Sequence, residues 1–143
     1  MRNIVIFMLF AATTGCAGPT TSAVATDNKP YNLNIGQMAV VQRRVASETL
    51  VPSRARVSGV AASITKDGIV EVCGFVSGLE FPGTYGPERA FMGVVGDNID
   101  GLTVFALSGG LAMTPVEQLA TERLCAASGM GPGSASLPSP GDI

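Results

Sequence analysis

The two ends of this 143-residue chain lack the composition of folded protein, so the fold has to be built from the residues between them. Residues 1–15 have the layout of a signal peptide, because Arg2 precedes an apolar run from Ile4 to Ala12 and small residues follow. A membrane-spanning helix needs about 20 apolar residues, so this run predicts export and not a membrane span. Residues 129–143 are rich in Gly, Pro and Ser, and we expect them to form a disordered tail.

The residues that follow the apolar run, Thr13-Thr14-Gly15-Cys16, resemble the lipobox of bacterial lipoproteins. In that family the cysteine thiol is diacylated, the peptide before it is removed, and the new amino group is usually acylated. The resemblance implies lipidation at Cys16, although Thr13 stands where the family usually has Leu. Cleavage by ordinary signal peptidase is the alternative, since Ala23-Val24-Ala25 and Gly15-Cys16-Ala17 would both suit that enzyme.

Residues 16–33 would then comprise the lipidated cysteine and a flexible tether, because they contain few large apolar side chains. A tether of this length has a root-mean-square span of about 20–25 Å and would hold a domain just off a bilayer. In the enterobacterial sorting pattern, an Asp directly after the lipidated cysteine is associated with retention in the inner membrane, and this chain has Ala17 at that position. The lipobox resemblance therefore implies a protein of the cell envelope, anchored by lipid in the outer membrane and facing the periplasm.

The three cysteines divide into one and two. If Cys16 carries lipid, Cys73 and Cys125 remain as an even pair in an exported chain, and such pairs are usually disulfides because the periplasm is oxidising. Two free, buried cysteines that act as small hydrophobic residues are the alternative. CxxC spacing is absent, so no zinc site is predicted.

The composition also excludes several classes of protein. The chain has no histidine, which rules out Ser-His-Asp and Cys-His catalysis, HExxH zinc sites and haem held by imidazole. A formal charge of −2 offers no basic surface for nucleic acid. Glu80 and Glu88 share one segment, but their positions in the sequence do not place them across a cleft as a hydrolytic pair. We therefore expect no enzymatic activity, no metal and no cofactor, and we recognise no small-molecule site.

The globular domain is predicted to cover residues 34–128 and to have an α+β fold. Asn34 can cap a helix that carries Met38, Val41 and Val45 on one side and stops before Pro52. Runs rich in Val, Ala and Ser predict a small, mainly antiparallel four-stranded sheet with one helix before it and one after it. The strands are expected at residues 56–65, 69–76, 90–95 and 102–107.

Two turns join these strands in pairs. Asp67-Gly68 predicts a tight hairpin in which both turn residues have positive φ, and Pro52 and Gly59 are expected to bend or bulge the entry to the first strand. The second connection, residues 96–101, holds two carboxylates and an amide. Its ligand spacing does not fit an EF-hand loop, because Ile99 stands where an oxygen ligand is needed, so a hairpin turn is favoured over a calcium site.

The second helix begins with a capping box, in which Thr114 is the cap, Pro115 is at N1 and Glu117 is at N3. Its apolar stripe is expected to be buried, and this stripe consists of Val116, Leu119 and Ala120, continued by Leu124 and Ala127. Cys125 points away from the stripe at 100° per residue. A bridge to Cys73 therefore requires the helix to end or shift near Leu124, or to be contacted on two sides.

The domain resembles a group of small exported proteobacterial proteins. The residues that carry this resemblance are Val51-Pro52-Ser53-Arg54-Ala55-Arg56-Val57, Val72-Cys73-Gly74-Phe75-Val76, and a Gly/Tyr-rich loop ending in Phe91. The pattern of the group runs approximately DPxSAxF, VCGxVN and FGGYxG. Here Val51 replaces the Asp and Ser77 the Asn, and the tyrosine of Pro82-Gly83-Thr84-Tyr85-Gly86 is shifted by one place. The resemblance supports the topology and export, and it implies no activity.

The candidate binding element is the segment 77–89, the one long irregular stretch predicted inside the domain. It holds Phe81, Tyr85 and Arg89, and aromatic residues with Arg are good anchors at interfaces. The alternative is a structural Ω-loop in which Phe81 and Tyr85 cap the core. The function expected from these features is a lipid-anchored, non-enzymatic binding or adaptor module for a protein partner. A periplasmic inhibitor of a wall-degrading enzyme or protease is the alternative, and surface exclusion against phage or conjugation is a third.

Overall fold

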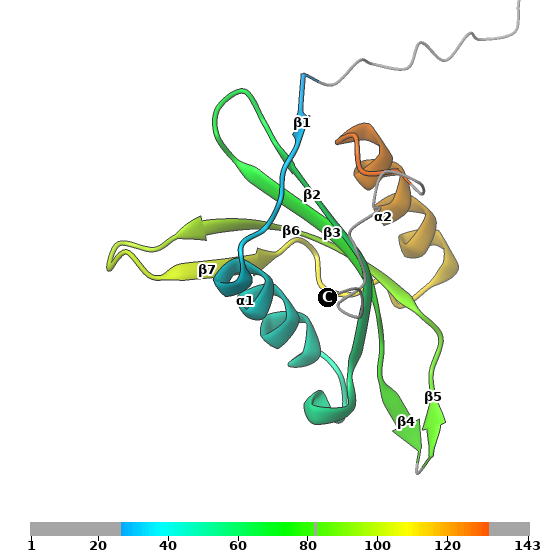
Figure 1. The fold of residues 1–143 in the computed structure, drawn as a ribbon. Helices are drawn as coiled ribbons and strands as arrows, with labels where there is room; N and C mark the ends of the chain where they lie inside the picture. Colours follow the sequence, from blue (N-terminus) through cyan, green and yellow to red (C-terminus); the bar gives the residue numbers. More distant parts are fainter. Residues whose placement is uncertain (1–26, 82, 132–143) are drawn as a thin grey trace, which may run out of the picture.

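A computed structural model describes residues 27–81 and 83–131, and its α+β fold is the one that the sequence predicts (Figure 1). A mainly antiparallel sheet has the order β1-β2-β3-β6-β7, and a small two-stranded ribbon, β4-β5, continues from it. The strands are β1 Lys29–Pro30, β2 Arg56–Ile64, β3 Val70–Ser77, β4 Leu79–Phe81, β5 Thr84–Tyr85, β6 Arg89–Asp97 and β7 Thr103–Leu107. The helices are α1 Ile35–Ala46, a 3-10 turn at Pro52–Arg54, and α2 Pro115–Ala127.

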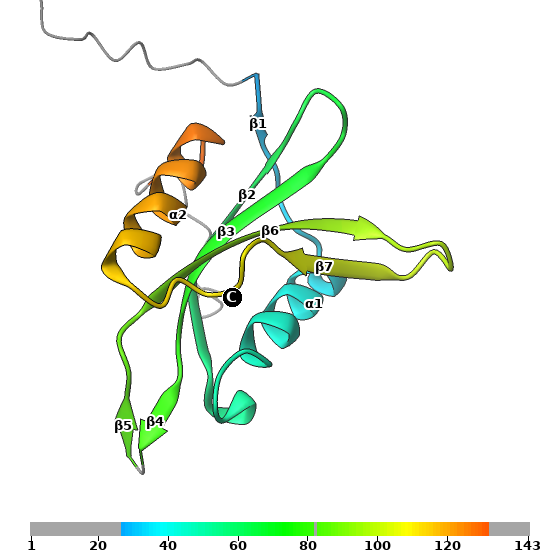
Figure 2. The ribbon, with the colours of Figure 1, turned by 180° about the vertical axis from the view of Figure 1, so that it is seen from behind.

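The two helices cover opposite faces of the sheet. Val41 and Val45 of α1 are fully buried in one cluster with Val72, whereas Cys125 of α2 packs beside Cys73. Because neighbouring residues of a strand point to opposite faces, residues 72 and 73 mark the two sides. The view from behind in Figure 2 shows α1 and α2 apart, with the sheet between them.

The face under α1 holds the main core. Asn34 caps α1 as predicted: its side chain accepts a hydrogen bond from the Gln37 backbone, and the Gln37 side-chain oxygen accepts one from the Asn34 backbone. Phe91 and Phe105 meet edge to face beneath the helix, with ring centroids 6.2 Å apart. Phe91 lies against Gly74, where a Cβ would be 2.7 Å from the ring. The glycine thus makes room for the aromatic residue on the neighbouring strand.

The predicted strand count is corrected from four to five, because β1 pairs with the free edge of β2. Lys29 lies opposite Ile64, and the Tyr31 backbone donates to the Ala62 carbonyl at 2.9 Å. Tyr31 and Leu33 pack against the core, so the fold begins inside the predicted tether. A two-residue strand is too short to show an alternating pattern, and it forms only because the edge of β2 is available. At the other end, Met130 is buried although the predicted domain stops at residue 128.

Both predicted hairpins are present, but the first turn has a different geometry. Only Gly68 has a positive φ, of 82°, so the prediction that Asp67 would also adopt one is wrong. Thr65 and Ile69 close a longer loop instead, through a backbone hydrogen bond of 2.9 Å. The bulge expected at Gly59 is confirmed, with φ of 57° and a register shift between Ser58 and Ala61.

The second hairpin turn, between β6 and β7, is closed by an asparagine side chain. The Asn98 carbonyl oxygen accepts hydrogen bonds from the backbone of Asp100 and of Leu102 at 3.0 and 2.9 Å. Asp97 accepts one from the Thr103 hydroxyl at 3.0 Å. The polar residues that resemble a calcium loop therefore hold the turn together.

The orientation predicted for α2 is wrong. The capping box at Thr114 and Glu117 is present, but Val116, Leu119 and Leu124 are 78, 48 and 57% exposed. The helix docks through Cys125 instead, which is the one residue of α2 that is buried. The helix continues through Leu124 to Ala127, so the disulfide to β3 requires neither an early end of the helix nor a contact on a second side of it. The covalent bond to β3 selects the docked face, and the apolar stripe points away from the sheet.

Candidate functional site

The site residues predicted from the sequence fall into three places. Cys16 lies outside the described residues, so its lipidation stays a prediction. Cys73 and Cys125 are joined by a disulfide of 2.07 Å between β3 and α2, with Cα atoms 6.0 Å apart. The bond is buried, and it attaches the last helix to the middle of the sheet.

The segment 77–89 is a β-hairpin arm and not an irregular loop, because β4 and β5 extend the ribbon begun by β3 and β6 (Figure 1). Leu79 lies opposite Tyr85, and the Gly86 backbone donates to the Gly78 carbonyl at 2.9 Å. Phe81 is 72% exposed, so it does not cap the core as an Ω-loop residue would. We refer to Leu79–Tyr85 as the β4–β5 arm.

Tyr85 and Arg89 are already engaged within the domain. The guanidinium of Arg56 lies 3.6 Å from the centre of the Tyr85 ring, in a cation–π contact. Arg89 forms an ion pair with Glu80 at 2.8 Å, and its other terminal nitrogen contacts the Met113 sulfur at 2.9 Å. Of the three predicted anchors, Phe81 is the one that the structure leaves exposed.

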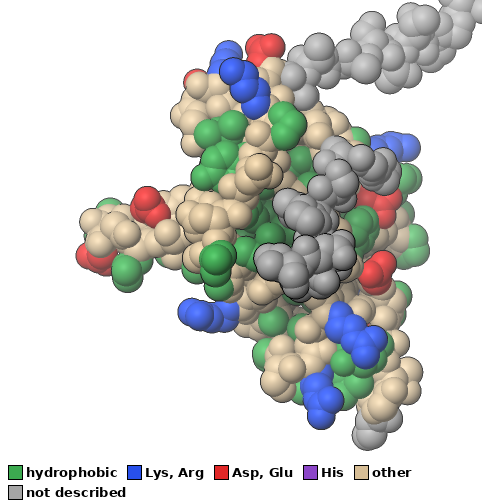
Figure 3. All heavy atoms as spheres, in the orientation of Figure 1, with side chains coloured by type: hydrophobic (Ala, Val, Ile, Leu, Met, Phe, Trp, Pro, Cys, Tyr) green, Lys and Arg blue, Asp and Glu red, His purple; other side chains and the backbone are tan. Residues whose placement is uncertain are grey.

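Phe81 and Arg89 lie on the same cavity, whereas Tyr85 does not line it. This cavity, the arm groove, has a volume of about 380 Å³ and lies between the arm, the segment after α1 and the segment before α2. Leu50 and Met113, 79 and 64% exposed, are two further apolar residues at its rim. Figure 3 shows hydrophobic side chains beside Lys and Arg side chains at the end of the molecule where the arm lies. Leu50 and Met113 were not predicted from sequence patterns, because they lie outside any periodic element.

The charged groups of the arm groove neutralise one another. Glu80 folds against the backbone at Gly86, where a Cβ would lie 2.3 Å from its carboxylate, and there it meets Arg89. Glu48, just after α1, forms an ion pair with Arg44, which lies one turn earlier in α1. Within the described residues, no cluster of His, Cys, Asp and Glu is suited to hold a metal ion. The groove therefore offers apolar contact together with a charge-neutral ion pair in its lining.

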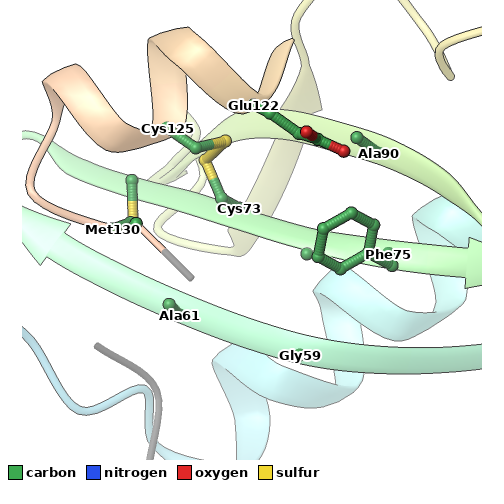
Figure 4. Close-up of a pocket in the computed structure, with 10 residues that line it drawn as sticks. Gly59, Ala61, Cys73, Phe75, Ala90, Glu122, Cys125 and Met130 are labelled. Atoms are coloured by element: carbon green, nitrogen blue, oxygen red, sulfur yellow. A yellow bond between two sulfur atoms is a disulfide. The ribbon is translucent and has the colours of Figure 1, made fainter. Parts of the chain in front are cut away.

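A second cavity, of about 330 Å³, lies between α2 and the sheet. Figure 4 shows Phe75, Met130 and the disulfide around it, with Glu122 reaching in from α2. The Glu122 carboxylate accepts a hydrogen bond from the Gln118 amide at 2.8 Å. The lining is mostly apolar, and it offers no pair of groups for acid–base chemistry.

The sequence Ser63-Ile64-Thr65-Lys66, at the end of β2 and the start of the following turn, has the S-x-x-K spacing of penicillin-binding proteins. In the structure Ser63 is buried on β2, and its hydroxyl has no hydrogen-bond partner. Lys66 is exposed in the β2–β3 turn. A substrate cannot reach this hydroxyl, so the motif does not form a nucleophilic site here.

Comparison with known proteins identifies no relative, because no family model, curated protein or solved structure matches the chain significantly. The resemblances to bacterial lipoproteins and to small exported proteobacterial proteins therefore remain predictions. Among residues 27–81 and 83–131, no helix combines the length and the hydropathy that a membrane span requires.

Proposed function

We propose that this protein is a non-enzymatic adaptor of the cell envelope, anchored by lipid at Cys16, that binds a protein partner through the arm groove. The observation that carries the proposal is the gathering of Leu50, Phe81 and Met113, all largely exposed, around one cavity. Contiguous exposed apolar groups on a soluble domain are typical of binding surfaces. A protein partner would cover them and remove them from water.

The dimensions and the chemistry of the groove suit a polypeptide. Its volume is at the low end of the range of ligand pockets, about 300–1,000 Å³, and would accept one or two apolar side chains. The Arg89–Glu80 pair in the lining can exchange hydrogen bonds with a peptide backbone without leaving an uncompensated charge. Phe81, held on a paired strand, is an aromatic anchor whose backbone is already ordered.

Anchoring at the envelope is supported by independent features. The signal-peptide layout and the lipobox-like Thr13-Thr14-Gly15-Cys16 predict export and lipidation. A buried disulfide between Cys73 and Cys125 suits an oxidising compartment. Two or more acyl chains would make the attachment stable, since one chain gives only marginal binding. Intact mass of the mature chain tests this part, because an unmodified Cys16 or a start at Thr26 would refute the anchor.

The binding role is tested by photo-crosslinking in intact cells. A photoreactive amino acid at Phe81 is expected to give a protein adduct, whereas the same residue at Ile99, fully exposed in the β6–β7 turn, serves as the control. Leu50→Glu should reduce the yield of the Phe81 adduct by about tenfold, which corresponds to about 1.4 kcal/mol of binding free energy. Equal adduct yields at Phe81 and Ile99 would refute the adaptor.

The projecting arm also fits the alternative function, a periplasmic inhibitor, because a β-hairpin with an exposed Phe81 at its end can enter an active-site cleft. The two functions predict different results with purified protein. An inhibitor slows a lysozyme or a periplasmic protease, and Phe81→Ala removes the effect. An adaptor leaves the rates of such enzymes unchanged while it still forms the crosslinked complex in cells.

A further inference from the structure

The outward face of α2 is apolar, and no described part of the chain covers it. Val116, Leu119 and Leu124 are 78, 48 and 57% exposed, and Ala120 and Ala127 are also exposed. At 100° per residue these five side chains share one side of the helix, opposite the side that carries Cys125. We refer to them as the α2 stripe. Amphipathic helices normally bury such a stripe against their own domain.

Three polar side chains of α2, those of Glu117, Gln118 and Glu122, form hydrogen bonds within the domain. The Gln118 side chain accepts a hydrogen bond from the Ala90 backbone at 2.8 Å and donates one to Glu122. The Glu117 carboxylate accepts from the Met113 and Thr114 backbones at 2.8 and 3.0 Å. Glu122 therefore lies on the side of α2 that faces the sheet, and the Glu117 carboxylate, at the edge of the stripe, is held in the cap at the start of the helix. Arg123, at the same helical angle as the stripe, is exposed, and its long side chain can extend toward phosphate groups.

The C-terminal end of α2 lies beside the first described residues of the chain. The Asn28 amide donates to the Ser128 carbonyl, just after α2, at 3.4 Å, and to Glu71 at 3.1 Å. Figures 1 and 2 both show the start of β1 and the C-terminal end of α2 at the same end of the molecule. An anchor at Cys16 would therefore hold α2 closer to the bilayer than β7 on the opposite edge of the sheet.

We propose that α2 lies on the bilayer that holds the anchor, with the α2 stripe among the lipid headgroups. This inference rests on the proposed lipidation of Cys16. Asn28 follows Cys16 by twelve residues, a flexible chain of that length spans about 17–21 Å, and α2 is about 20 Å long. The reach of the tether thus allows the whole helix to lie on the surface. An apolar helix face in this position is the arrangement of interfacial helices.

A second copy of the chain is a poorer occupant of the stripe. A stable dimer buries about 800 Å² on each partner, or 20–30 residues a side, and α2 has 13 residues of which one face is free. In a symmetric pairing of two such stripes, Arg123 near the middle would also approach its own copy. A lipid surface needs no such match of shape or charge.

The test measures lipid contact at α2 in the full mature chain, acylated at Cys16 and reconstituted into phosphatidylethanolamine–phosphatidylglycerol vesicles. A fluorescent amino acid replaces Leu119 in one sample and Ile99 in the other, and nitroxide-labelled lipids serve as quenchers. We expect at least twofold stronger quenching at position 119. Leu124→Glu should lower the quenching at position 119 to the level seen at Ile99, while the matched variant Ile99→Glu leaves it unchanged.

The outcomes separate this inference from the proposed anchor. Recovery of the chain with vesicles reports the anchor, and the ratio of quenching at positions 119 and 99 reports α2. Equal quenching at positions 119 and 99 in an anchored chain overturns the α2 inference. Shielding of position 119 from lipid by a second copy or by another protein overturns it as well. If the chain is not acylated, a hexahistidine tag in place of Cys16, bound to nickel-chelating lipid, supplies the attachment, and the same ratio decides.

Discussion

Replacing both half-cystines, Cys73→Ala together with Cys125→Ala, should lower the free energy of unfolding by about 4 kcal/mol. The bond spans 52 residues of sequence, and in the chain-entropy model a loop of that size removes about 14 cal/mol/K from the unfolded chain. At 25 °C this entropy corresponds to about 4 kcal/mol. A domain of this size has about 5–15 kcal/mol in total, so the bond supplies a large share of it. Alanine is preferred to serine because both sites are buried.

The structure adds a local consequence, because α2 buries no other residue than Cys125. Without the bond, the helix is held to the sheet mainly by the Ala90–Gln118 hydrogen bond and the packing of Met130. A surface contact of this kind stabilises a domain weakly, with about 0.5–1.5 kcal/mol for a hydrogen bond. We therefore expect α2 to detach while the core beneath α1 stays folded.

The assay is urea unfolding of residues 17–143, followed by far-ultraviolet circular dichroism, together with hydrogen exchange read by mass spectrometry. With a denaturant slope of about 1.5–2 kcal/mol/M, the midpoint should fall by about 2–3 M urea. Amides of α2 should lose protection well before those of β3. Reduction of the wild-type chain should reproduce both effects. A midpoint shift below about 0.5 M, or equal loss of protection in α2 and β3, would refute the reasoning.

Three further predictions test the packing and the caps. Gly93→Ala should destabilise the domain by about 1–3 kcal/mol, because its Cβ would lie 2.4 Å from the Ala106 carbonyl, whereas the matched Gly96→Ala, with open space, should change the urea midpoint little. Hydrogen bonds from the Met113 backbone, and then from the Thr114 backbone, hold the pKa of Glu117 below its ordinary 4.5. The Glu117 carboxylate therefore stabilises the folded domain above that pH, and this stabilisation is lost as the pH falls through the lowered pKa. The difference in melting temperature between wild type and Glu117→Gln should therefore shrink below about pH 4.5, and a constant difference would contradict this origin. Asn34→Ala removes the cap of α1 and should cost about 1 kcal/mol by urea unfolding, and an unchanged midpoint would exclude the capping role.

The candidate site was only partly predictable. Of the three candidate anchors in the segment 77–89, Phe81 and Arg89 line one groove, whereas Tyr85 is stacked under Arg56 on another side. Leu50 and Met113 complete the groove from segments with no periodicity. They are brought together by the way α1 and the segment before α2 cross the ends of β3 and β6. Such proximity depends on long-range packing, which no local pattern contains.

Local chemistry determined much of this fold. Both helix caps, the four main strands, the two hairpins and the bulge at Gly59 follow from hydrogen bonds and torsion angles among near neighbours, which the sequence displays directly. Tertiary structure alone decided the short strand β1, the β4–β5 arm and the direction of α2. In each case the deciding interaction joins residues far apart in the chain: an unpaired edge of β2, the ribbon begun by β3 and β6, and a covalent bond between Cys73 and Cys125. The periodicity of α2 marks an apolar face, but that bond determines which face meets the sheet.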